Sequence, residues 1–104
     1  MRYLKVYWLH TSKEEAASEP WVLLYEVGAQ NLACRAIEVF GDRLMNKLTD
    51  LYSEAIEITE IPTISEINEG IWGEHLIAYE IGVEEFEALW QAQRYSGDLY
   101  VSME

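Results

Sequence analysis

The chain contains few of the residues that build disulfides, metal sites or reactive centres. Among 104 residues it has one cysteine, Cys34, and two histidines, His10 and His75. A single cysteine cannot form an internal disulfide, so we expect a protein of a reducing compartment, the bacterial cytoplasm. The histidines lie far apart and show no HxH or HxxxH spacing, so no metal site is predicted.

Long apolar runs and the common ligand-binding motifs are also absent. No stretch approaches the roughly 18–20 apolar residues of a membrane span, and the N-terminus lacks the apolar segment of a signal peptide. The sequence has no GxGxxG, GxxxxGK[ST] or GxSxG motif, which would indicate a nucleotide site or a nucleophile. We therefore expect one domain over residues 1–104 that is not an enzyme, holds no cofactor and does not bind a membrane.

Basic residues are scarce in the second half of the chain. Residues 48–104 contain thirteen acidic residues and one basic residue, Arg94, whereas residues 1–47 contain six of each. The net charge of −12 therefore belongs entirely to the second half. Such a surface repels phosphate backbones, so we expect no direct nucleic-acid binding. It favours fast encounter with a basic protein, although these acids are also typical of an ordinary solvated surface.

Alternating apolar and polar residues predict a sheet. The pattern favours strands within residues 2–10, 21–27, 33–40 and 53–61, with the first three in an antiparallel meander. Residues 43–53 fit a helix or a strand, and residues 69–82 are expected to be extended or irregular. On the second strand, we expect Trp21, Leu23, Tyr25 and Val27 to share one face.

Two helices are predicted after these strands. Thr63 and Glu66 have the spacing of a capping box, which predicts a short helix near 63–69 that ends at Gly70. Residues 83–94 carry an apolar stripe at helical spacing. The expected fold is α+β: an antiparallel sheet of four to five strands with the C-terminal helix packed on one face. The tail, residues 95–104, is expected to be loosely held.

Several short segments together resemble a family of small bacterial proteins known as a domain of unknown function. The resemblance covers residues 3–90 and rests on the order of its motifs: a K-V-x-W-x-H first strand, an R-x-[IV]-E-[IV]-F strand and a final E-E-F-E-A-[LV]-W helix. Gly41-Asp42 stands where the family tends to place Asp-Gly. The resemblance implies an α+β domain without an established activity.

Charged residues on the predicted strands suggest cross-strand pairs that fix the register of the sheet. We expect Arg35 to meet Glu26 across a hairpin and Lys5 to meet Glu38.

The segment 53–74 contains six glutamates and no basic residue. Glu57 and Glu60 fall on opposite faces of an extended strand, and Glu66 serves as a capping residue, so local spacing builds no carboxylate pair. We predict a protein-binding module, such as an immunity-type inhibitor of a basic partner. Its predicted partner-binding residues are Glu57, Glu60, Glu66, Glu69, Trp72 and Glu74.

Two other functions remain open at this point. One is a small ligand-binding or metal-dependent enzyme domain that uses His10, His75 and nearby glutamates. The other is a structural homodimer joined through sheet edges or exposed aromatic residues.

Overall fold

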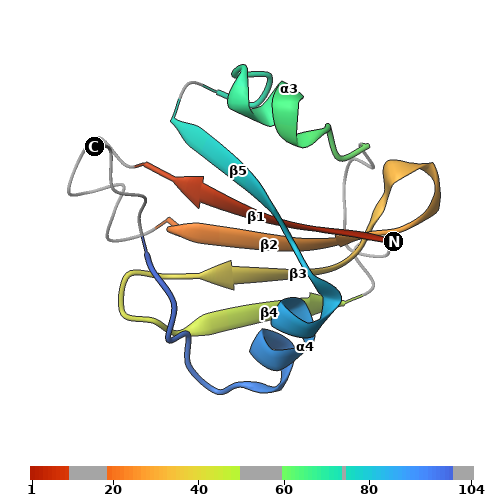
Figure 1. Ribbon diagram of the computed structural model, residues 1–104. Coiled ribbons are helices and arrows are strands. Elements are labelled where there is room, and N and C mark those ends of the chain that lie inside the picture. Colours follow the sequence, from red (N-terminus) through yellow and green to blue (C-terminus); the bar gives the residue numbers. More distant parts are fainter. Residues whose placement is uncertain (10–18, 50–59, 74, 100–104) are drawn as a thin grey trace.

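The computed structural model describes residues 1–9, 19–49, 60–73 and 75–99. Within these residues the chain forms a five-stranded antiparallel sheet with two α-helices, which confirms the predicted α+β class (Figure 1). The strand order is β4-β3-β2-β1-β5. The strands are β1 (Arg2–Trp8), β2 (Val22–Val27), β3 (Ala33–Val39), β4 (Met45–Thr49) and β5 (Leu76–Ile81).

Strand β1 lies inside the sheet, hydrogen-bonded to β2 on one side and β5 on the other. Its residues alternate between two covered faces, as the aromatic and apolar residues at both parities predict. Leu4 and Val6 are buried on one face, and Tyr7 is buried on the opposite face together with the partly buried Tyr3. The first three strands form the predicted meander, and the short 3-10 turn Ala29–Asn31 connects β2 to β3.

The last strand of the sheet comes from a segment that the sequence left as extended or irregular. Residues 76–81 are extended and form β5, in which Ala78 lies opposite Val6 of β1. This pairing joins segments about seventy residues apart in the chain, so local pattern carries little sign of it. Segment 43–53 fitted either a helix or a strand, and its residues 45–49 form strand β4. The predicted strand at 53–61 lies largely outside the described residues.

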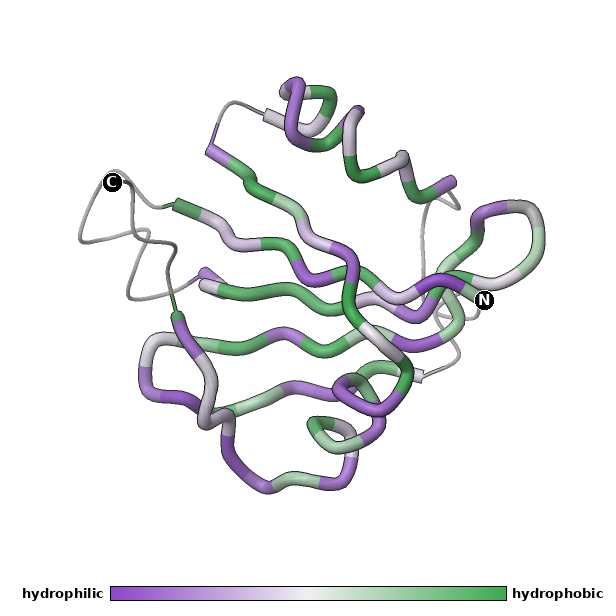
Figure 2. Tube along the Cα trace, in the orientation of Figure 1, coloured by the Kyte–Doolittle hydropathy of each residue, from purple (hydrophilic) through white to green (hydrophobic). Residues whose placement is uncertain are grey.

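The two faces of the sheet carry separate apolar clusters. One, here called the α3 face, contains Leu4, Val6, Val27, Ala33, Ile61, Ile67 and Ala78. The other, the α4 face, contains Tyr7, Val22, Leu24, Ile37, Val39, Phe86 and Tyr95. Figure 2 shows hydrophobic and hydrophilic segments along the strands, with hydrophilic residues at the turn between β3 and β4. Leu23, Tyr25 and Val27 share the α3 face as predicted, whereas Trp21 packs with the α4 face. The prediction was wrong for Trp21 because this residue precedes β2 and lies outside its alternation.

Helix α3 (Ile64–Asn68) begins with the predicted capping box, in which Thr63 and Glu66 exchange hydrogen bonds. Ile67 is its buried contact with the sheet. The side chain of Asn68 accepts a 2.6 Å hydrogen bond from the Ala78 N–H and donates a 3.2 Å hydrogen bond to the Ala78 carbonyl. Asn68 therefore binds the outer edge of β5 as a neighbouring strand would, and it fixes α3 beside that edge.

Helix α4 (Val83–Gln91) packs on the opposite face of the sheet through the fully buried Phe86. In Figure 1, α3 lies at the top beside β5 and α4 lies at the bottom. The helix ends three residues before the predicted boundary, and the chain continues extended from Ala92. Tyr95, the first residue of the tail that was expected to be loose, is 1% exposed. Its N–H donates a hydrogen bond to the Arg43 carbonyl.

Candidate functional site

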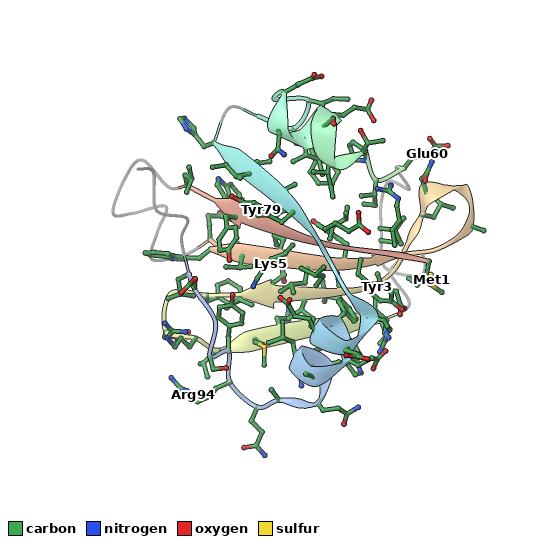
Figure 3. All side chains as sticks on the ribbon, in the orientation of Figure 1. Met1, Tyr3, Lys5, Glu60, Tyr79 and Arg94 are labelled. Atoms are coloured by element: carbon green, nitrogen blue, oxygen red, sulfur yellow. The ribbon has the colours of Figure 1, made fainter. Side chains whose placement is uncertain are left out.

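The predicted partner-binding residues that the structure describes gather on and around α3. We call this region the α3 surface and define it by Glu60, Glu66, Glu69, Ile71 and Trp72, all of which are exposed. Glu60 precedes the helix at the edge of the molecule (Figure 3). Glu66 lies in α3, and Glu69 is the residue directly after its C-terminal end. The other two predicted residues, Glu57 and Glu74, lie outside the described residues.

A tight bend after α3 presents two large apolar side chains to solvent. Gly70 ends the helix with a φ of 98°, and Gly73 has a φ of 139°, both in the region that favours glycine. Hydrogen bonds from the Gly70 and Gly73 N–H groups, each 3.1 Å, hold the bend. Between the glycines, Ile71 is 58% exposed and Trp72 is 39% exposed. Exposed large side chains beside a charged rim are typical of protein interfaces.

The carboxylates of the α3 surface make no ion pair among the described residues. The three ion pairs found there involve Glu26, Glu85 and Glu87, which belong to the other side of the sheet. Hydrogen bonds from Thr63 hold the pKa of the Glu66 carboxyl below its usual value. This keeps Glu66 charged near neutral pH, so the surface presents unneutralised negative charge.

A small cavity opens beside the bend. It has a volume of about 190 Å³ and is lined, among the described residues, by Trp8, Leu23, Trp72, Gly73, His75 and Leu76. The outer wall is Trp72, whose ring meets that of Tyr25 edge-on with centroids 6.0 Å apart. Trp72 therefore belongs both to the exposed bend and to the cavity, and His75 of the ligand-binding hypothesis lies at the same place.

Charged groups on the α4 face are paired with one another. Arg35 of β3 donates hydrogen bonds of 2.9 and 2.6 Å to the carboxylate of Glu26 on β2. It also binds Glu87 of α4, and its guanidinium lies 5.0 and 4.8 Å from the ring centroids of Phe86 and Trp90. Arg35 thus fastens the helix to the sheet. Its hydrogen bonds lower the pKa of Glu26, which is only 7% exposed.

The register of the sheet explains which predicted pairs form. Glu26 lies directly opposite Arg35 on the same face, so the pair predicted from sequence is confirmed. The predicted pair of Lys5 with Glu38 was wrong. Lys5 lies on the α4 face (Figure 3), where its ammonium binds the Glu85 carboxylate at 3.2 Å, whereas Glu38 accepts a hydrogen bond from Asn46.

Neither a metal cluster nor a membrane-spanning helix is found in the described part of the chain. No group of three His, Cys, Asp or Glu side chains there is arranged to hold a metal ion. None of its helices is long and apolar enough to cross a membrane. His10, which the metal-dependent alternative requires, lies outside the described residues.

Comparison with known proteins identifies the family. A family model described as "Domain of unknown function (DUF6881)" matches residues 2–95. The chain belongs to this family. The match extends from the start of β1 to the buried Tyr95. It therefore includes the α3 surface and the Arg35 cluster, that is, Arg35 with Glu26, Phe86, Glu87 and Trp90. It confirms the resemblance inferred from the sequence. No curated protein and no solved structure matches the chain.

Sequence reasoning missed two features of the site. The contact between Arg35 and Glu87 joins a strand residue and a helix residue that are 52 positions apart in the chain. Local patterns predict the helix, but they do not show which strand residue Glu87 contacts. The cavity was missed because its walls come from β1, β2, the bend and β5. From the sequence, Trp72 could either plug the core or face a partner, and the structure shows it partly exposed at the edge of the cavity.

Proposed function

We propose that this protein is a protein-binding module whose α3 surface docks onto a basic protein. An immunity-type inhibitor is the specific form that we propose: the acidic surface would cover a site on the partner that normally holds phosphate. In this proposal the protein acts by binding and not by catalysis.

The observation that carries the proposal is the combination of exposed apolar residues with unpaired carboxylates. Ile71 and Trp72 are the apolar centre, Glu66 and Glu69 lie beside Ile71, and Glu60 lies before α3. Interfaces gain most of their binding energy from a few aromatic anchors, while surrounding charges steer the encounter and select the partner. The α3 surface provides both parts within one short segment.

The charge distribution supports a basic partner. All of the net charge of −12 comes from residues 48–104, and the α3 surface lies in that half. On the α4 face the carboxylates of Glu26, Glu85 and Glu87 already form ion pairs with Arg35 and Lys5. Among the described residues, Glu60, Glu66 and Glu69 form no ion pair, so their carboxylates remain available for lysine and arginine side chains of another protein.

The experiment has two stages. The tagged protein is first incubated with a lysate of its source organism, and proteins retained at about 50 mM salt are identified by mass spectrometry. A retained basic protein is then purified, and its affinity is measured at about 50 and 500 mM salt. Surface charges are strongly screened at the higher concentration, so we expect the dissociation constant to rise at least tenfold.

Two results would contradict the proposal. The first is that no basic protein is retained at low salt, while the tagged protein remains folded by circular dichroism. The second is an affinity that does not change between the two salt concentrations, because the binding would then not depend on the acidic surface.

A further inference from the structure

The cavity beside the bend is built to hold one apolar group. Two tryptophans and two leucines, Trp8, Trp72, Leu23 and Leu76, supply most of its lining. Its volume of about 190 Å³ compares with about 150 Å³ for an engineered apolar cavity that binds benzene. The space therefore matches a single aromatic ring and not an extended ligand.

The surroundings of the cavity are acidic on two sides. On one side, Glu66 and Glu69 line an open hollow together with Gly70 and Ile71, directly before Trp72. On the other side, Trp72 contacts Tyr25. Glu38 of β3 lies directly opposite Leu23, a residue of the cavity lining, so a carboxylate lies on that side as well.

We infer that this cavity receives one aromatic side chain of the basic partner, carried on a segment with lysine or arginine on both sides. The inference rests on the proposed function for the source of the segment. The aromatic ring enters between Trp72 and Leu76, and the flanking basic residues meet Glu38 on one side and Glu66 and Glu69 on the other. A buried aromatic anchor within a ring of charges is the usual arrangement of an interface hot spot.

The test uses three blocked pentapeptides as probes. The first has phenylalanine between two pairs of lysines, the second replaces phenylalanine with alanine, and the third replaces the lysines with serines. Binding is followed by NMR through the indole N–H signal of Trp72, which the Trp72→Phe variant assigns. We expect the first peptide to bind at least fivefold more tightly than either of the others.

Variants of the protein locate the binding to the cavity. His75 is an exposed cavity residue, so His75→Ala changes the lining without disturbing the core, and Trp72→Ala removes the outer wall. Both variants are expected to weaken binding of the first peptide at least threefold. Val83→Ala, at an exposed residue of α4, is the matched control and should leave it unchanged. Unfolding midpoints of all three are measured in parallel.

The outcomes separate this inference from the proposed function. Equal binding of the phenylalanine and alanine peptides, or no effect of His75→Ala, would overturn the inference about the cavity. Equal binding of the lysine and serine peptides would make the occupant an uncharged aromatic ligand, which also overturns it. If a basic partner binds with the expected salt dependence while His75→Ala leaves its affinity unchanged, the proposed function holds and the cavity inference fails.

Discussion

The two faces of the sheet use acidic residues in opposite ways. On the α4 face, Glu26 and Glu87 bind Arg35, and Glu85 binds Lys5, so each carboxylate is part of the packing between helix and sheet. On the α3 face, Glu60, Glu66 and Glu69 are exposed and form no ion pair among the described residues, and Glu66 and Glu69 lie beside the bend that presents Trp72. The same residue type therefore stabilises the fold on one side and remains available for a partner on the other.

The largest expected difference between the faces concerns their aromatic residues. Phe86 is fully buried beneath α4, and Phe86→Ala is expected to lower the free energy of unfolding by about 3–5 kcal/mol because it leaves a cavity in a packed core. Trp72→Ala removes a partly exposed side chain, and a loss of less than about 2 kcal/mol is expected. Urea unfolding measures both. Equal losses would mean that Trp72 is a core residue and not a presented one.

The next effect concerns Arg35. Arg35→Met leaves Glu26 buried without its partner and frees Glu87 of α4, so we expect a loss of about 2–4 kcal/mol in unfolding free energy. Arg94→Met is the control: Arg94 is an exposed arginine that hydrogen-bonds the Asp42 carbonyl, and its loss should be about 1 kcal/mol or less. If the two variants were equally stable, the Arg35 cluster would not fasten α4 to the sheet.

A smaller loss is expected where α3 meets the sheet. Asn68→Ala removes two hydrogen bonds to the backbone of Ala78, which is 2% exposed, and it uncovers the edge of β5. We expect a loss of about 1–2 kcal/mol, with a tendency to associate through the freed edge. Light scattering and urea unfolding measure the two effects. Ser65→Ala, on the exposed side of the same helix, provides a control that should change neither.

The smallest effect is the pH dependence that Glu26 adds. The pKa of Glu26 is lower in the folded protein than its usual value. A group with a depressed folded pKa contributes stability above its unfolded pKa and loses that contribution as pH falls through the folded pKa. Wild-type stability should therefore fall more steeply than that of Glu26→Gln as the pH drops below about 4.5. Parallel curves for the two proteins would show that Arg35 does not stabilise the Glu26 carboxylate.

Local sequence patterns predicted much of the fold. The alternation of β1 to β3, the Thr63–Glu66 capping box and the stripe of α4 are local signals, and each was found in the structure. The pairing of Glu26 with Arg35 followed from the hairpin between neighbouring strands. Strand β5 and the salt bridge between Lys5 and Glu85 could not be predicted in the same way, because each joins segments more than sixty residues apart.

The candidate site was predicted only as a stretch of sequence. The run of glutamates indicated an acidic surface, and Trp72 in an irregular acidic loop fitted either a plug of the core or a side chain presented to a partner. The cavity required the positions of Trp8, Leu23 and Leu76 on three different strands or their ends, which local pattern does not supply. Likewise, only the structure shows that Glu85 and Glu87 form ion pairs, whereas Glu66 and Glu69 form none among the described residues.

The contrast between paired and unpaired acids is tested most directly by two matched double variants. Glu66→Gln with Glu69→Gln removes two charges from the α3 surface, and Glu84→Gln with Asp98→Asn removes two exposed charges outside it. Each variant's affinity for the captured basic partner is measured at about 50 mM salt. We predict that the first variant binds about tenfold more weakly and that the second binds as the wild type does. Equal weakening by both would mean that net charge, and not the α3 surface, governs binding, and it would contradict this account.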